Sequence, residues 1–165
     1  MTDVTKNWTG NIDLNSNIEI NTLLEGIAQA FNSSPFFVHN AMKMSVTDGQ
    51  IEARVDMASN LIGNVAFQIL HGGVAATLLD SIGGISAMAE LYKKATAEDL
   101  AETSKKVSRL ATVDMRVDYL APGRGQYFVA RAETLRLGRK GCTMRMTMLN
   151  DEGKAIATAI ASYAY

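Results

Sequence analysis

One carboxylate stands alone in a long uncharged stretch of the sequence. Between Met57 and Ala89 the only formally charged side chain is that of Asp80. If this stretch is helical, Asp80 shares its side of the helix with five very small residues, Gly73, Ala76, Gly83, Gly84 and Ala87. A helix face that meets only water normally carries several charges, so this face is predicted to contact another backbone or a ligand. A carboxylate in that place is a candidate for general-base or nucleophilic chemistry.

Two glycines open the same predicted helix. Gly72 and Gly73 follow His71, which stands at the position of a helix cap. The first turn of a helix leaves backbone N–H groups without intrahelical acceptors, and the helix dipole adds positive potential there. Because glycine has no Cβ, a ligand oxygen can come close to these N–H groups. The sequence therefore predicts an oxyanion-binding site here, with His71 orienting the loop or bonding a carbonyl oxygen.

The separation between the carboxylate and the glycines predicts how many chains the site needs. Gly73 and Asp80 are seven residues apart, which is roughly 10 Å along a helix axis. A base or nucleophile and an oxyanion donor must both lie within about 3 Å of one reacting centre. A second copy of the helix, antiparallel across a two-fold axis, would bring Asp80 of one chain to the glycines of the other. We therefore expect an obligate homodimer with two composite sites.

Hydrophobic periodicity predicts the elements that position these residues. Apolar side chains recur at helical spacing in 18–31 and 72–94. Strands are predicted at 36–46, 50–57, 107–119, 126–137, 142–148 and 154–164. In 107–119, Val113 and Met115 are expected on one side and Thr112 and Asp114 on the other. Residues 57–70 are expected to be a loop, and residues 95–106 a frayed helix end or a connection. The fold class is therefore α+β, with an antiparallel sheet wrapped lengthwise around one long helix.

Composition excludes several classes of protein. The length of 165 residues predicts one domain at 19–165 after a polar, weakly ordered lead at 1–18. Lys and Arg number 16 against 17 Asp and Glu, which argues against nucleic acid as the main partner. The single Cys142 fits a reducing compartment. No signal peptide or membrane span is expected, and the cytoplasm is the predicted location. Two histidines exclude a multi-histidine zinc site, so no metal is predicted.

A basic turn is a second candidate for ligand binding. Arg139 and Lys140 stand between Gly138 and Gly141, in a chain whose formal net charge is −1. The glycines expose backbone N–H groups beside two cations, an arrangement that favours a phosphate group. A solvated hairpin turn has the same composition, so these residues alone leave both interpretations open.

Several motifs together resemble the hotdog-fold acyl-CoA thioesterases. They are Asn-Leu-Ile-Gly-Asn at 60–64, Ile-Leu-His-Gly-Gly-Val at 69–74, Leu-Leu-Asp at 78–80, Val-Asp-Tyr-Leu-Ala-Pro at 117–122 and the Gly-Arg-Lys-Gly turn at 138–141. The chain is most similar to the PaaI/YigI-like branch of that family, over about residues 20–164. The resemblance implies a hotdog fold, in which six antiparallel strands wrap around one central helix, and commonly a dimer of dimers.

The resemblance also implies a reaction. The substrate is a fatty acyl-CoA, of medium to long chain length, that is hydrolysed to the free acid and CoA without a cofactor beyond the coenzyme A of the substrate. Asp80 acts as general base on water or as nucleophile at the thioester carbonyl. The N–H of Gly72, with that of Gly73, polarises this carbonyl, and His71 fixes the loop. The basic turn meets the phosphates of coenzyme A.

The same resemblance implies that Asn64 positions water or the thioester. This chain differs from similar proteins at two places that concern such polar groups. The interval from Asn64 to His71 is one residue longer than in similar proteins, which makes Gln68 a second candidate for that role. Some similar proteins carry a hydroxyl one turn after the acid, where this chain has Gly84. Ser81 is then the nearest substitute.

Two other functions use the same residues. An acyl-thioester hydratase or dehydratase of the same fold would use His71 and Asp80 together on the carbons next to the thioester. A non-catalytic module would bind acyl-CoA without turnover. The glycine pair after His71 favours the thioesterase.

Overall fold

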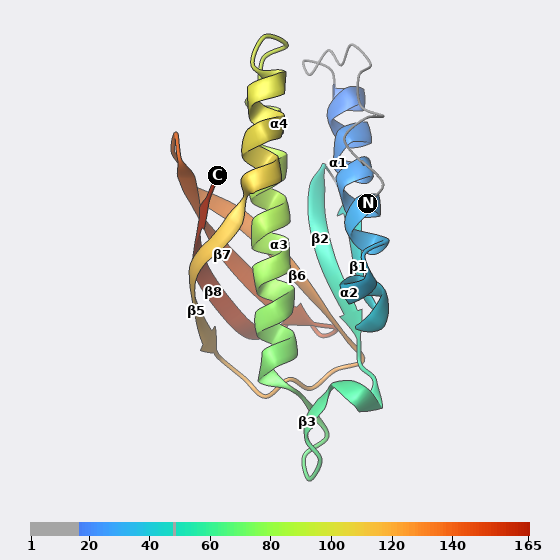
Figure 1. Cartoon of the computed structure of the whole chain (residues 1–165). Helices are drawn as coiled ribbons and strands as arrows, with labels where there is room; N and C mark the ends of the chain where they lie inside the picture. Colours follow the sequence, from blue (N-terminus) through green and yellow to red (C-terminus); the bar gives the residue numbers. More distant parts are fainter. Residues whose placement is uncertain (1–16, 48) are drawn as a thin grey trace.

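The computed structural model describes residues 17–47 and 49–165, which form one curved sheet around a long helix (Figure 1). The helices are α1 (Asn17–Asn32), α2 (Pro35–His39), α3 (Gly72–Lys93) and α4 (Leu100–Arg109), with a 3₁₀ turn at Ser59–Leu61. The strands are β1 (Met42–Thr47), β2 (Gln50–Asp56), β3 (Ile62–Asn64), β4 (Ile69–Leu70), β5 (Ala111–Tyr119), β6 (Tyr127–Leu137), β7 (Gly141–Asn150) and β8 (Ala155–Ala164). Six of them form an antiparallel sheet in the order β1-β2-β6-β7-β8-β5, which confirms the predicted fold class.

The core lies between α3 and the face of the sheet that wraps around it. Alternate side chains of β7 and β8 point to this side and are almost fully buried, namely Met144, Met146, Met148, Ala157, Ala159 and Ala161. Met146 lies opposite Ala159 in the sheet, so large and small side chains alternate across neighbouring strands. Helix α3 fills the space above them with Leu78, Leu79, Ile82 and Ile85. The predicted alternation of β7 and β8 is therefore confirmed, because successive side chains of a strand point to opposite faces.

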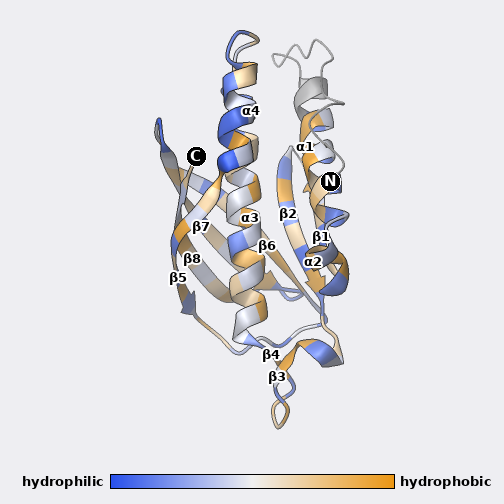
Figure 2. Ribbon diagram, in the orientation of Figure 1, coloured by the Kyte–Doolittle hydropathy of each residue, from blue (hydrophilic) through white to orange (hydrophobic). Residues whose placement is uncertain are grey.

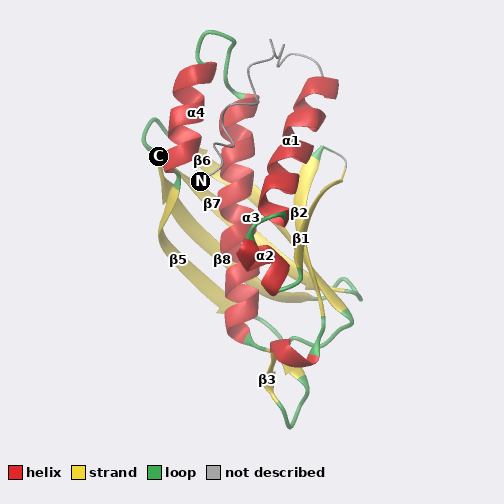
Figure 3. Cartoon of the chain, turned by 45° about the vertical axis from the view of Figure 1, so that its right-hand side comes forward, coloured by secondary structure: helices red, strands yellow, loops and turns green. Residues whose placement is uncertain are grey.

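Helix α3 is the central element of the structure. By length and composition alone it could cross a membrane. It contacts β2, β5, β6, β7 and β8, with α1 packed beside it over β1 and β2 (Figure 3). The apolar character of α3 is thus that of a core helix.

The strand predicted at 36–46 is wrong over its first half. Pro35–His39 form α2, and β1 begins only at Met42. Ser34 caps α2 by accepting a hydrogen bond from the N–H of Phe37 at 3.3 Å. Pro35 occupies the first turn, where its missing N–H would have had no intrahelical acceptor. A helix of five residues is too short to show a helical period in the sequence.

Two connections contain more structure than predicted. The loop at 57–70 includes the hairpin of β3 and β4, which projects beyond the lower end of the sheet (Figure 3). The connection at 95–106 holds most of α4, and the next strand begins at Ala111 rather than at residue 107. The predicted lead at 1–18 lies outside the described residues, apart from Asn17 and Ile18, which belong to α1.

A bulge in β5 changes which of its side chains face α3. Thr112 pairs with Tyr163 and Asp114 pairs with Ser162, so Val113 is an extra residue in β5. An extra residue reverses the alternation of a strand. Thr112 therefore lies on the α3 side, and Val113 is 67% exposed. The sequence pattern predicted Val113 on the α3 side of the sheet and Thr112 on the other side. The bulge reverses both positions, so this prediction is wrong.

Candidate functional site

The start of α3 has the features of an oxyanion site. His71 is the N-cap, and its Nδ1 accepts a hydrogen bond from the N–H of Gly73 at 2.8 Å. This bond assigns the imidazole proton to Nε2. The N–H of Gly73 thus already has an acceptor within the chain. Among the described residues the N–H of Gly72 has no acceptor, so Gly72 is the donor that remains for a ligand.

A cavity of about 410 Å³ adjoins Gly72. The hydroxyl of Tyr119 donates to the carbonyl oxygen of Gly72 at 3.0 Å, and this bond ties the helix start to the end of β5. The cavity is mostly apolar, with Ile69, Leu70, Ala75, Leu120 and Ile156 among its lining residues. An acyl chain is the kind of group that such a lining accommodates.

Asp80 lies two turns further along α3 and is half-buried. Its Oδ1 accepts a hydrogen bond from the hydroxyl of Thr112 at 2.9 Å. The hydroxyl of Tyr163 donates to the backbone carbonyl of Asp80 at 3.0 Å and lies 3.5 Å from Oδ1. Burial raises the pKa of Tyr163, and the negative charge of Asp80 raises it further, so this phenol stays a neutral donor.

Tyr163 also explains part of the small-residue stripe on α3. A Cβ at Gly83 would collide with the Tyr163 hydroxyl and would lie 2.9 Å from Sδ of Met146. A Cβ at Gly84 would lie 3.4 Å from the Tyr163 ring. The sequence interpretation assigned this stripe to a second helix or a ligand. At these two glycines, however, the close neighbour is β8 of the same chain.

Within one chain the two parts of the candidate site remain separate. The eight residue-to-residue steps from Gly72 to Asp80 cover roughly 12 Å of helix. The only hydroxyl-bearing partners of the Asp80 carboxylate among the described residues are Thr112 and Tyr163. Ser81 forms no hydrogen bond to this carboxylate, although it was the expected source of a hydroxyl.

Asn64 is the last residue of β3 and lies where the turn of the β3–β4 hairpin begins. Its Oδ1 accepts a hydrogen bond from the N–H of Phe67 at 3.2 Å, so the side chain shapes the turn while its amide nitrogen has no acceptor among the described residues. Gln68 has a positive φ of 50° and donates to the Val65 carbonyl at 2.7 Å. The side chains of Asn64 and Gln68 thus both form hydrogen bonds within the turn. Gly63 permits close contact with His71, because a Cβ there would lie 2.6 Å from the His71 Cα.

The basic turn joins β6 to β7 at the opposite end of the sheet from the start of α3 (Figure 1). The N–H of Gly138 donates to the Gly141 carbonyl at 2.9 Å, and Tyr165 donates to the Gly138 carbonyl at 2.8 Å. Arg139 and Lys140 are exposed. Both side chains are available for a ligand, but they lie far from Gly72 of the same chain.

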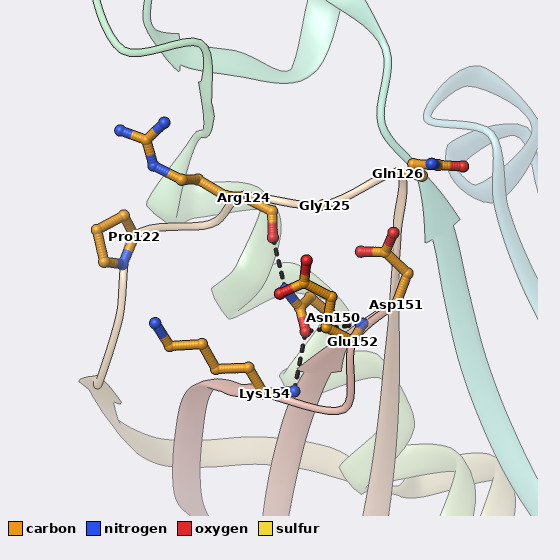
Figure 4. A pocket seen from close by; sticks show the side chains of 8 residues that line it. All are labelled: Pro122, Arg124, Gly125, Gln126, Asn150, Asp151, Glu152 and Lys154. Carbon is orange, nitrogen blue, oxygen red and sulfur yellow. Dashed lines mark hydrogen bonds between the residues drawn. The ribbon is translucent and has the colours of Figure 1, made fainter.

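A second cavity, of about 430 Å³, contains none of the predicted site residues (Figure 4). Asn150 lies at its centre and donates to the Arg124 carbonyl at 2.8 Å. The Oδ1 of Asn150 accepts from the N–H groups of Glu152 and Lys154. These bonds hold two loops together, and we assign this region a structural role. In the described part of the chain, no group of three or more His, Cys, Asp or Glu side chains could hold a metal ion.

Sequence reasoning missed Thr112, Tyr163 and Tyr119. All three reach α3 from strands that lie more than 30 residues away in sequence. The alternation of the sequence placed Thr112 on the face away from α3, because the bulge at Val113 cannot be seen in the sequence. The signal for Tyr163 was a buried polar aromatic opposite two glycines, which gains meaning only once β8 is placed beside α3.

Comparisons with known proteins identify the family. Residues 67–157, more than half of the chain, match the family model described as Thioesterase superfamily. Over 103 residues the chain is 40% identical to the medium/long-chain acyl-CoA thioesterase YigI of Escherichia coli. The aligned part is 62% of this chain and 66% of YigI, so the chain spans just under two thirds of the length of that protein. A Shewanella oneidensis protein described as related to the thioesterase superfamily aligns with a TM-score of 0.80 at 37% identity, covering 90% of this chain and 99% of that one. A Bacillus halodurans protein with CoA shares the fold at a TM-score of 0.65 and 21% identity, over 92% of this chain and 90% of that one. The chain belongs to the thioesterase superfamily.

Proposed function

We propose that the protein is an acyl-CoA thioesterase that hydrolyses medium- to long-chain fatty acyl-CoA in the cytoplasm, with no added cofactor. The observation that carries this proposal is that α3 holds both groups that the reaction needs. The Asp80 carboxylate accepts a hydrogen bond from Thr112 of β5, and the N–H of Gly72 at the start of α3 has no acceptor among the described residues. One group can activate water and the other can stabilise an oxyanion. The similarity to a medium/long-chain acyl-CoA thioesterase supports the substrate class.

The edge of the sheet supports a dimer with composite sites. Strand β5 pairs with β8 on one side and is the outer strand on the other. Its exposed side chains include Val113 at 67% and Tyr119 at 57%. Antiparallel pairing of two β5 strands across a two-fold axis would lay the Thr112 end of one chain beside the Tyr119 end of the other. Asp80 of one chain would then approach Gly72 of its partner.

The hydrolysis follows from these two groups. Asp80 takes a proton from water as the water oxygen bonds to the thioester carbon. The carbonyl oxygen becomes an oxyanion and accepts a hydrogen bond from the N–H of Gly72 of the other chain. The C–S bond then breaks, and the proton held by Asp80 passes to the departing thiolate. If Asp80 attacks the carbon itself, the C–S bond breaks and the thiolate leaves as an anhydride forms. Water then hydrolyses this anhydride to the free acid and the Asp80 carboxylate, and the proton released from water passes to the thiolate.

The remaining predicted residues have supporting roles in this proposal. His71 keeps the helix start in place through its bond to Gly73. The amide nitrogen of Asn64, which has no acceptor among the described residues, holds water or the thioester at the hairpin. Arg139 and Lys140 contact the phosphates of CoA, with Gly138 and Gly141 keeping the turn tight.

Thiol release from a panel of acyl-CoA substrates tests the proposal. We expect turnover that is highest for medium and long chains, and a fall of about 10³-fold in Asp80→Asn, since this variant keeps the size of the side chain but cannot accept the proton. Asp56→Asn is the matched control, because the ion pair of Asp56 among the described residues is with exposed Arg54. No thiol release from any substrate, or full activity in Asp80→Asn, would contradict the proposal. Hydration of enoyl-CoA without thiol release would identify a hydratase, and saturable binding without turnover would identify a binding module.

A further inference from the structure

Positive charge is concentrated at one end of the molecule, although the whole chain has a formal net charge of −1. In residues 17–47 and 49–165, ion pairs to described residues use Arg54, Lys93, Lys105, Arg116, Arg131 and Arg145. Five of the cations outside this set lie at the end of the sheet that carries the basic turn, namely Lys106, Arg109, Arg136, Arg139 and Lys140. We call these five residues the basic end.

Strand pairing places the two halves of the basic end next to each other. Ala111, which follows α4 after one residue, pairs with Ala164 of β8. Gly141, which follows the basic turn, pairs with the same Ala164 from the other side. Ala111 and Gly141 are thus two strand spacings apart, roughly 10 Å. The last turn of α4 leads into one of these two positions, and the basic turn leads into the other. Figure 2 shows hydrophilic residues along the lower part of α4 and at the tip of the turn.

The basic end is also close to the candidate catalytic carboxylate. Thr112, which bonds Asp80, is only three residues after Arg109. Residues three apart in the chain are at most roughly 10 Å from each other between their Cα atoms. A ligand anchored at Arg109 by its phosphates could therefore present a thioester to Asp80 through a flexible arm of the length found in coenzyme A.

Helix stability explains only part of this charge. Lys106 and Arg109 lie in the last turn of α4, where cations interact favourably with the helix dipole. That effect does not require three further cations from β6 and the basic turn at the same end. Cations that come together from separate elements, without an ion pair to the described residues, are typical of a surface that binds an anion.

We propose that Lys106 and Arg109 of α4 form, with the basic turn, the binding site for the nucleotide phosphates of coenzyme A. This inference rests on the proposed thioesterase function and adds α4 as an element of substrate recognition. Arg109 is exposed and gives a forked set of donors that matches phosphate oxygens.

The test compares two substrates that share one thioester. Dodecanoyl-CoA carries the phosphates, and the N-acetylcysteamine thioester of dodecanoic acid does not. In Arg109→Gln we expect KM for dodecanoyl-CoA to rise roughly three- to tenfold, more at low salt than at high salt, with kcat unchanged. KM for the N-acetylcysteamine thioester stays at the wild-type value. Lys106→Gln shows the same pattern, and the matched control Lys43→Gln on β1 changes neither KM.

Several results would overturn the inference. An equal rise of both KM values in Arg109→Gln would indicate general damage to the site, and an unchanged KM for dodecanoyl-CoA would show that α4 binds no phosphate. A rise in KM for a dodecanoyl carrier protein, without a rise for dodecanoyl-CoA, would assign the basic end to an acidic protein instead. If wild type hydrolyses neither thioester, the proposed function fails. Calorimetric titration with CoA then still decides the inference, which is wrong if Arg109→Gln binds CoA as tightly as wild type.

Discussion

The two ends of the candidate site are built in different ways. The start of α3 is completed by its own neighbours in sequence, since His71 caps Gly73 and the Gly72 amide has no acceptor among residues 17–47 and 49–165. Asp80, two turns later, depends on β5 and β8, which supply Thr112 and Tyr163. The same helix therefore presents a locally determined donor and a carboxylate whose surroundings come from distant strands. Substitutions at Gly72 should therefore affect one hydrogen bond, whereas substitutions near Asp80 should also disturb the packing of α3 against the sheet.

After Asp80→Asn, the largest effect is expected from removing the donor at the helix start. Gly72→Pro deletes the N–H, while the first helical position and the extended backbone of His71 both accept a proline. We expect kcat to fall by about 100-fold or more, which is the usual effect of losing one oxyanion donor. Gly72→Ala is the control, since it adds a Cβ 3.2 Å from the Tyr119 ring but keeps the N–H. Equal activity in the two variants would show that the amide is not used.

The next effect concerns packing around Asp80. Gly83→Ala places a Cβ against Tyr163 and Met146, and we expect a loss of about 2 kcal/mol in the free energy of unfolding. Gly84→Ala meets the Tyr163 ring only at 3.4 Å and should be neutral or stabilising by up to about 1 kcal/mol. Urea denaturation of both variants measures the difference. The account of the small-residue stripe is wrong if Gly84→Ala is the more damaging change.

Thr112 tests whether the carboxylate needs a partner from β5. Thr112→Val keeps the shape and removes the hydroxyl, and we expect kcat to fall about tenfold with little change in KM, since one hydrogen bond to a charged group is lost. Thr112→Ser should restore most of the activity. Ser81→Ala should leave kcat near wild type, and a larger loss there than in Thr112→Val would return the role to Ser81.

The smallest effect at neutral pH is expected from Tyr163, whose contribution depends on pH. Its pKa is raised by burial, so the unfolded chain releases the phenolic proton at a lower pH than the folded chain does. Stability from this group is present below the ordinary tyrosine pKa of about 10 and is lost as pH rises above it, by up to about 1.4 kcal/mol per pH unit. Tyr163→Phe should flatten this alkaline loss in thermal unfolding curves, whereas Tyr92→Phe should not.

The contrast between the two ends also marks what the sequence could predict. Patterns within short windows of sequence predict the succession of the main strands along the chain and the central helix. They also predict the two glycines at the start of that helix and the isolated Asp80. The bulge at Val113 could not be predicted, because it depends on the register between β5 and β8. Helix α2 was missed because Ser34 and Pro35 specify it by capping rather than by period. The Tyr163 contact requires two segments that are 83 residues apart to be placed together.

Mixed dimers test the central claim most directly. Asp80→Asn and Gly72→Pro chains, each with its own affinity tag, are co-expressed and the dimers that carry both tags are isolated. If each site takes its carboxylate from one chain and its amide from the other, one of the two sites is intact, and activity should return to about half of wild type although each parent homodimer is inactive. If the mixed dimers stay as inactive as the parents, the carboxylate and the amide act within one chain, and the composite site is wrong.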